Sequence, residues 1–281
     1  MRASFQYLGR GSWLAARDPR VTLLAAVAFV VGAIQLRDAR QLLVALVLAL
    51  LYYALAGIPF RRVRFQWIYL TITIVLIAGI NTIITGGRAG GFATADLHVL
   101  FRLPLLQAPI TAEAISLSAS QTLRFLAFVA VSLPVAYAIA PGDFAVAMRR
   151  LGLPDRAAFT LDLTIRFLPT LVNEFAETID AQRVRGWDPL AHGGGPVTRI
   201  RRIAPIFVPV IIGSIAGAED TIDAMDLRGF GVGRRTWLRE LRFRPMDWLL
   251  LGLFLAFLVL ATYLNLSGNS RHYLLPFLVG G

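Results

Sequence analysis

Five long apolar runs restrict the fold of this sequence more than any other feature. A helix needs about 20 predominantly apolar residues to cross a bilayer, within a range of roughly 17–25. Hydrophobic residues make up 57% of the 281-residue chain and are gathered in these runs rather than spread as amphipathic stripes. We therefore expect an all-α, polytopic membrane protein with about five transmembrane helices, at residues 21–36, 41–60, 67–85, 112–140 and 246–266.

The positions of the basic residues predict the orientation of the chain. The net charge is +11, and all 28 Lys and Arg residues are arginine. If the amino terminus is cytoplasmic, 22 arginines lie on the cytoplasmic side: four before residue 21, three at 61–64 and fifteen between 142 and 245. Positively charged segments stay preferentially inside, so we expect a multi-pass protein of the cell membrane with a cytoplasmic amino terminus. Because the arginines lie between apolar spans, insertion in a lipid bilayer accounts for their positions. We therefore expect no nucleic-acid partner.

Two missing residue types exclude several classes of protein. The sequence contains no lysine, whereas a Walker A loop needs a lysine to contact the nucleotide phosphates. The chain is therefore not a P-loop ATPase, and an ATP-driven machine that contains it takes its ATPase from another polypeptide. The sequence also contains no cysteine, which excludes disulfides and thiolate metal sites.

The segment between the fourth and fifth predicted spans has a different pattern. Its apolar residues follow a helical period, interrupted by Pro169, Pro205 and Pro209. We predict three amphipathic helices on the inner face of the membrane, at residues 143–151, 156–185 and 200–228. The predicted organisation is residues 1–141 with four spans, residues 142–245 as a cytoplasmic region, and residues 246–281 with the last span and a tail. In the outer stretch 86–111 we expect a loop with a short hairpin.

One eleven-residue sequence occurs twice within the cytoplasmic region. Residues 177–187 read ETIDAQRVRGW, and residues 220–230, which lie 43 positions later, read DTIDAMDLRGF. Six of the eleven positions are identical, and each copy closes a predicted helix with arginine, glycine and an aromatic residue. The positions that we single out are Ala181, Val184, Arg185, Gly186 and Trp187 in the first copy, and Ala224, Leu227, Arg228, Gly229 and Phe230 in the second.

Helix capping explains part of this repeat. Glycine adopts the left-handed conformation that ends a helix, and an arginine in the last turn suits the negative end of the helix dipole. A cap needs only the last few residues, however, whereas the match begins eight positions before the glycine. We therefore interpret the copies as two equivalent docking points. The arginine would pair bidentately with a carboxylate, the alanine would let a partner helix approach, and the aromatic residue would anchor in a pocket.

The repeat resembles a signature of the transmembrane T component of energy-coupling factor transporters, a branch of the ATP-binding-cassette superfamily. That family carries two short Ala-Arg-Gly signatures at the ends of two long cytoplasmic coupling helices. The corresponding positions here are 184–186 and 227–229, where Val184 or Leu227 replaces the alanine and the Arg-Gly pair is kept. The sequences MRRLGLP at 148–154 and RFLP at 166–169 also fit the pattern of the family.

The resemblance implies a non-catalytic transporter subunit with long cytoplasmic coupling helices. Such a subunit would transmit the ATP-driven motion of two ATPase subunits to a small membrane protein, the S component, that captures a vitamin or a transition-metal ion. ATP and Mg would be bound by the ATPase subunits. We therefore expect no catalytic residue, cofactor or metal in this chain.

Two alternatives fit the residues less well. A membrane-embedded metal-dependent transferase needs paired aspartates, and Asp220, Asp223 and Asp226 do recur every three residues. Such a charge run is more often a solvated helix face, and Asp226 aligns with Arg183 in the other copy. An ordinary ATP-binding-cassette permease couples through a single short helix in each subunit, whereas this chain has two candidate docking ends.

Overall fold

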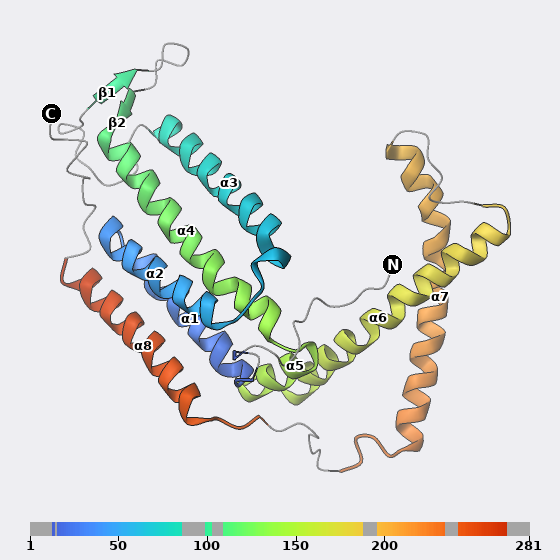
Figure 1. Cartoon of the computed structure of the whole chain (residues 1–281). Helices are drawn as coiled ribbons and strands as arrows, with labels where there is room; N and C mark the ends of the chain where they lie inside the picture. Colours follow the sequence, from blue (N-terminus) through green and yellow to red (C-terminus); the bar gives the residue numbers. More distant parts are fainter. Residues whose placement is uncertain are drawn as a thin grey trace. The chain divides into compact units, whose positions relative to one another are not determined.

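The computed structural model describes residues 13–14, 16–85, 99–102, 109–187, 196–233 and 241–268. The segment 1–12, which we predict to be cytoplasmic, and the tail 269–281 lie outside these residues. The helices and strands of the described part are α1 (Pro19–Gln35), α2 (Ala39–Leu55), α3 (Phe60–Thr85), β1 (Val99–Arg102), β2 (Pro109–Thr111), α4 (Ala112–Ala138), α5 (Pro141–Arg150), α6 (Asp155–Val184), α7 (Pro196–Leu227) and α8 (Pro245–Leu266) (Figure 1). The predicted all-α polytopic fold is confirmed, and the expected hairpin is present as the antiparallel pair β1–β2.

The chain divides into two compact units. One unit, which we call the spanning unit, contains α1 to α4, the hairpin and α8, and the other contains α5, α6 and α7. Helices α3, α4 and α8 are long and apolar enough to cross a membrane. Helices α1 and α2 have 17 residues each, which is the lower end of the range for a spanning helix.

Part of α7 also satisfies the length and hydropathy of a spanning helix, although we predict that α7 lies along the inner face. This part is Ile203–Leu227. The reason is the uneven placement of charge, because residues 203–218 contain no charged side chain and the acidic residues of α7 follow only after them. The middle of α7 is therefore strongly apolar, whereas its first turns contain three arginines and its last turns are acidic.

Small side chains allow the helices of the spanning unit to pack closely. Helix α1 packs against α8 and α4, and α2 packs against α4. Membrane helices associate through van der Waals contact, which favours small residues at their interfaces. Fully buried alanines of these helices include Ala25, Ala33, Ala45, Ala49, Ala127 and Ala130.

Aromatic rings fill the interface between α1 and α8. The ring of Phe29 stacks on Phe257 with centroids 5.0 Å apart and meets Phe254 edge-on at 5.9 Å. Gly32 leaves room for this packing, because a Cβ atom at that position would lie 2.9 Å from a ring carbon of Phe257. Substitution of Gly32 would therefore require the Phe257 ring to shift.

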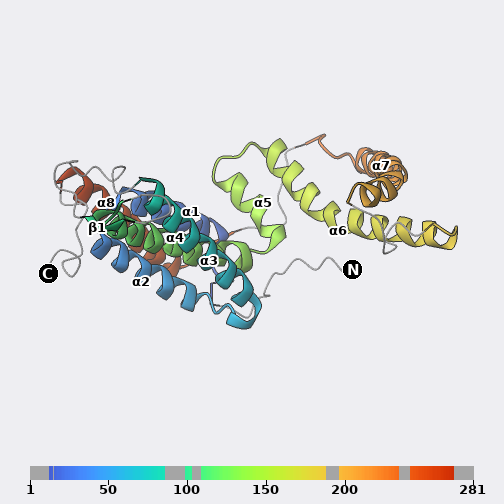
Figure 2. The ribbon, with the colours of Figure 1, turned by 90° about the horizontal axis from the view of Figure 1, so that it is seen from above.

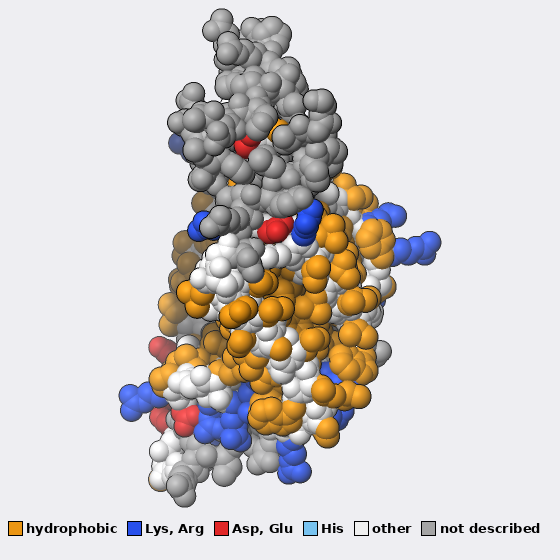
Figure 3. All heavy atoms as spheres, turned by 90° about the vertical axis from the view of Figure 1, so that its left-hand side faces the viewer, with side chains coloured by type: hydrophobic (Ala, Val, Ile, Leu, Met, Phe, Trp, Pro, Cys, Tyr) orange, Lys and Arg blue, Asp and Glu red, His pale blue; other side chains and the backbone are white. Residues whose placement is uncertain are grey.

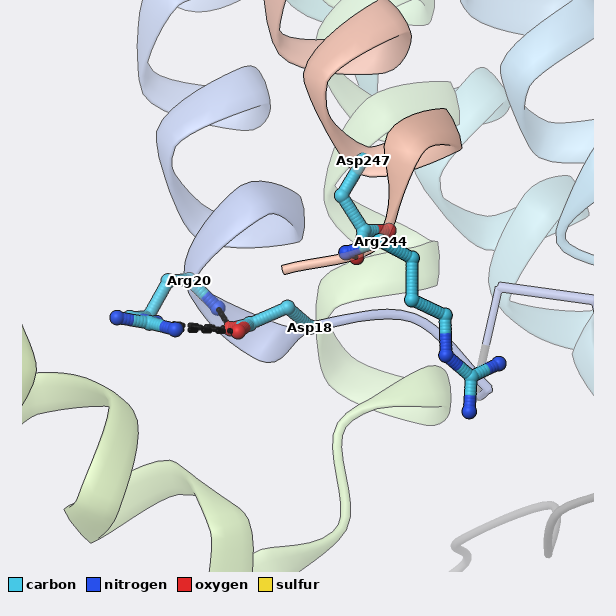
Figure 4. Close-up of polar contacts among 4 residues, drawn as sticks. All are labelled: Asp18, Arg20, Arg244 and Asp247. Atoms are coloured by element: carbon cyan, nitrogen blue, oxygen red, sulfur yellow. Dashed lines mark hydrogen bonds and ion pairs between the residues drawn. The ribbon is translucent and has the colours of Figure 1, made fainter. Parts of the chain in front are cut away.

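The starts of α1 and α8 lie side by side and are fixed by polar contacts (Figure 4). Asp18 caps α1 by accepting from the Arg20 N–H at 3.0 Å, and its carboxylate pairs with the Arg20 guanidinium at 2.6 Å. The same guanidinium lies 4.2 Å from the ring centroid of Phe243, which precedes α8. In α8, the buried Asp247 accepts from the Arg244 N–H at 2.8 Å. The Asp18-Pro19 pair therefore starts α1 as its sequence suggests.

Polar side chains join helix α3 to α4. The Tyr137 hydroxyl of α4 donates to Gln66 at 2.8 Å, and the Asn81 amide donates to Gln121 at 3.1 Å. Most other large side chains of α3 are exposed, including Tyr69. Since hydrogen bonds between helices are favourable away from water, these pairs hold α3 against α4 while its apolar face stays open.

Arg124, which lies within the fourth predicted span, has a structural contact. Its guanidinium donates to the carbonyl of Leu36 at 2.5 Å. Leu36 is the C-cap of α1, where carbonyl groups have no partner within the helix. Arg124 of α4 thus supplies a hydrogen-bond donor to a carbonyl at the end of α1.

The surface of the spanning unit fits a bilayer environment. Figure 3 shows a face on which apolar side chains cover the middle, while most charged side chains lie toward its two ends. Large exposed apolar residues on α1, α2 and α8 include Val27, Val44, Leu249 and Val259. A soluble monomer rarely exposes an apolar surface of this extent, so the chain is a multi-pass membrane protein.

Candidate functional site

The repeated sequences lie at the ends of the two longest helices. We predict these helices at 156–185 and 200–228, and the structure has them at Asp155–Val184 (α6) and Pro196–Leu227 (α7). The prolines that interrupt the periodicity do not break the helices, since Pro169 lies inside α6, and Pro205 and Pro209 lie inside α7. An internal proline removes one backbone hydrogen bond and bends a helix. In helices as long as α6 and α7, the turns before and after each proline remain helical.

Helices α6 and α7 cross and touch near their middles (Figures 1 and 2). The rings of Phe175 and Phe207 meet edge-on with centroids 5.4 Å apart. The Ser214 hydroxyl donates to the Glu174 carboxylate at 3.2 Å. The crossing point therefore lies about ten residues before the end of α6 and leaves that end projecting beyond it.

The end of α6 forms a Schellman cap. The Trp187 N–H donates to the Gln182 carbonyl at 2.9 Å, and the Gly186 N–H donates to the Arg183 carbonyl at 3.0 Å. Gly186 has a φ of 82°, which glycine adopts without the steric cost that a Cβ atom brings. The cap ends the helix with Arg185 as its C-cap residue.

The end of α7 has the same cap at the equivalent positions. The Phe230 N–H donates to the Met225 carbonyl at 3.0 Å, and the Gly229 N–H donates to the Asp226 carbonyl at 2.9 Å. Gly229 has a φ of 66°. The two copies of the repeat thus fold into the same local structure, with Arg228 in the place of Arg185.

A third Schellman cap shows that the cap alone is not a docking signal. It ends α5, where the Leu153 N–H donates to the Met148 carbonyl at 3.1 Å and Gly152 has a φ of 110°. Leu151 occupies the position of the arginine in this cap. The arginine and the residues before it, rather than the glycine, therefore distinguish the repeat.

The residues next to the two caps are exposed to a matching degree. We call residues 181–187 the first tip and residues 224–230 the second tip. Val184 is 88% exposed and Leu227 is 89% exposed. Arg185, Arg228 and the two alanines of the tips are also exposed. Within the described residues neither arginine side chain has an ion pair or hydrogen bond, so each tip presents an apolar side chain beside an available guanidinium.

The tips differ in the contacts of their aromatic residues. The ring of Phe230 in the second tip packs against Phe159 of α6, with centroids 4.8 Å apart and planes tilted by 38°. Trp187 in the first tip is 46% exposed and has no ring contact among the described residues. Phe159 has no signal in the sequence, because its partner lies 71 residues later and no local motif surrounds it.

The copies also differ in charge. The first copy has two acidic residues and two arginines and sums to zero, whereas the second has three aspartates and one arginine and sums to −2. In the first, Arg183 pairs with Asp180 at 3.1 Å on the surface. The three aspartates of the second copy are exposed, and no group of three potential metal ligands occurs in the residues that the structure covers.

Comparisons with known proteins agree with the resemblance of the repeat. Residues 10–237 match the CbiQ family, described as cobalt transport protein. The energy-coupling factor transporter transmembrane protein EcfT of Listeria innocua is 30% identical over 259 residues, which are 88% of this chain and 91% of that protein. The EcfT protein of Thermanaerovibrio acidaminovorans is 28% identical over 258 residues, which are 88% of this chain and 90% of the relative. This chain therefore belongs to the CbiQ family and is a transmembrane T component of an energy-coupling factor transporter.

Proposed function

We propose that this chain couples ATP hydrolysis by two partner ATPase subunits to the movement of a small substrate-capture protein in the membrane. The first tip and the second tip each dock in one ATPase subunit. Arg185 and Arg228 pair with acidic groups there, and Val184 and Leu227 bury their side chains beside them. ATP and Mg are bound by the ATPases, and this chain is not an enzyme.

The matched exposure of the two tips supports this proposal best. A guanidinium that has no partner among the described residues and an apolar side chain that is almost fully exposed occur together twice, on the same type of cap. Arginine and large apolar side chains are common at the centres of protein interfaces. A pair of similar docking points on one chain fits two ATPase subunits better than the single coupling helix of an ordinary permease.

The proposed orientation places the amino terminus and helices α5 to α7 in the cytoplasm. The distribution of arginine supports it, and the ATPases need access to both tips from that side. The transported substrate is a vitamin or a transition-metal ion, and its selection belongs to the capture protein.

Isolation of the complex tests this function. We expect the full-length chain, tagged and purified in mild detergent from its native cell, to retain two ATPase chains and one small membrane protein. Reconstituted in liposomes, the complex should take up substrate only when ATP is supplied on the side of the tips. Purification of the chain alone, with an enzymatic activity of its own, would instead favour the transferase alternative.

A further inference from the structure

We infer that Phe159 is a positioning residue that fixes the second tip to the start of α6, so that movement of this tip carries α6 with it. The inference rests on the proposed docking function. It concerns how motion leaves the second tip, and it makes the two tips mechanically different.

The contact joins two points that are far apart in the chain and important in the fold. Phe159 lies in the first turns of α6, and Phe230 directly follows the glycine of the second cap. Their ring centroids are 4.8 Å apart, which is within the range in which aromatic pairs attract one another.

Phe230 is rigidly connected to the arginine of the second tip. Its backbone N–H belongs to the Schellman cap, and the turn continues with a hydrogen bond from the Val232 N–H to the Gly229 carbonyl at 3.2 Å. Only Gly229 separates Phe230 from Arg228. A force on Arg228 is therefore transmitted to the Phe230 ring without passing through a flexible segment.

The contact supplies a second point of attachment between α6 and α7. The other lies at the crossing, where Phe175 meets Phe207. Along α6 this point is 16 residues from Phe159, or about 24 Å. Two helices that touch at one point can pivot about it, whereas a second contact at this distance fixes their angle. The Phe159–Phe230 pair therefore makes α6 and α7 move together.

The start of α6 is itself well connected to the preceding helix. Helix α5 packs against α6, and Arg149 of α5 forms an ion pair with Asp155 at the start of α6. In the sequence, only residues 139–140 separate α5 from α4. Through Phe159, the second tip therefore contacts the end of α6 that packs against α5. The first tip lies at the opposite end of α6.

The test compares Phe159→Ala with Phe167→Ala, a partly buried phenylalanine of α6 that has no ring contact among the described residues. Each variant is assembled with its ATPases and capture protein in liposomes. We expect Phe159→Ala to retain both ATPases and to keep ATP hydrolysis within about twofold of the parent, while substrate uptake falls at least fivefold. Phe167→Ala should keep substrate uptake within twofold of the parent, and Phe159→Leu should keep at least half of the parent's uptake.

Reversible cross-linking distinguishes a mechanical role from a general loss of stability. Because the chain has no cysteine, the double variant Phe159→Cys/Phe230→Cys offers one defined pair of thiols. We expect this variant to lose uptake, to regain it when a short bis-methanethiosulfonate joins the thiols, and to lose it again with reductant. Uptake by Phe159→Ala equal to that of Phe167→Ala, or a cross-link that leaves uptake low, would overturn the inference.

The same experiment separates this inference from the docking function. Arg228→Glu should release one ATPase, whatever the role of Phe159. If Arg228→Glu keeps both ATPases and full uptake, the docking function itself is wrong. If Arg228→Glu loses an ATPase while Phe159→Ala keeps the same substrate uptake as Phe167→Ala, only the positioning role of Phe159 is wrong.

Discussion

The first tip and the second tip have the same local structure and different surroundings. Both are Schellman caps in which the last helical residue, Val184 or Leu227, is almost fully exposed and an arginine directly follows it. In the second, Phe230 packs against Phe159 of α6, whereas Trp187 of the first has no ring contact among the described residues. The second copy also carries a charge of −2, whereas the first copy is neutral.

This difference shows what a repeated sequence does and does not determine. A helix cap depends on hydrogen bonds within six residues, so two similar sequences form it independently of their context. The stiffness of a helix end depends on contacts with distant residues, which the repeat does not contain. The two ends therefore offer a partner the same chemistry and different mechanical support.

Substitution of the cap glycines should have the largest effect and should affect both tips equally. At Gly186 and Gly229 a Cβ atom would meet nothing closer than 3.9 Å, so Gly→Ala strains only the backbone. We expect a local cost of about 1–2 kcal/mol from the left-handed conformation, and about 0.5–1.5 kcal/mol for each cap hydrogen bond that is lost. Binding of the corresponding ATPase, measured by titration in detergent, should weaken at least tenfold.

Gly217→Ala provides the control for this prediction. Gly217 lies within α7, has open space around it and has no positive φ. Alanine there should leave ATPase binding unchanged and stabilise the helix by up to about 1 kcal/mol. Equal loss of binding in Gly217→Ala would show that the assay reports stability rather than the cap.

Truncation of the exposed apolar residues should have the next largest effect. Each CH₂ group buried at an interface contributes about 0.8 kcal/mol, so Leu227→Ala should weaken ATPase binding by up to about 2.4 kcal/mol and Val184→Ala by up to about 1.6 kcal/mol. Since both side chains are exposed in the chain alone, thermal stability without partners should stay the same within about 0.5 kcal/mol. Unchanged binding in both variants would exclude these residues from the interface.

Exchange of the differing charges should have the smallest effect. The variant Asp226→Arg copies Arg183 of the first tip, and Arg183→Asp copies the second. Exposed charges contribute about 0–1 kcal/mol and are screened by salt. We expect each variant to change the affinity of its own ATPase by no more than about fivefold at low salt, with the difference lost at 1 M salt. An effect that persists at high salt would mean that these residues are buried in the complex.

The sequence predicts the helices of this protein well because each signal is local. The apolar runs, the Asp18-Pro19 start of α1 and the Arg-Gly ends all depend on a few consecutive residues, and the structure has helices and caps at those positions. The helices predicted at 156–185 and 200–228 also run through Pro169, Pro205 and Pro209 in the structure, since a long helix bends at a proline and continues.

Contacts between distant residues could not be predicted in the same way. Phe159 is one of 18 phenylalanines, and nothing near it in the sequence marks its contact with Phe230. Arg124 shows the same limit, because its contact is the Leu36 carbonyl on another helix. A residue type and its neighbours indicate where a helix ends, but its tertiary partner depends on how the helices pack.

The number of ATPase subunits bound to single arginine variants tests the docking of the two tips most directly. Native mass spectrometry of the detergent-purified complex would count them for Arg185→Glu, Arg228→Glu and the double variant, with Arg156→Glu at the exposed start of α6 as the control. Since breaking a buried charge pair costs about 2–5 kcal/mol, we predict one ATPase in each single variant, none in the double variant and two in the control. Two ATPases retained in both single variants and in the double variant would contradict the proposal that these tips are the docking points.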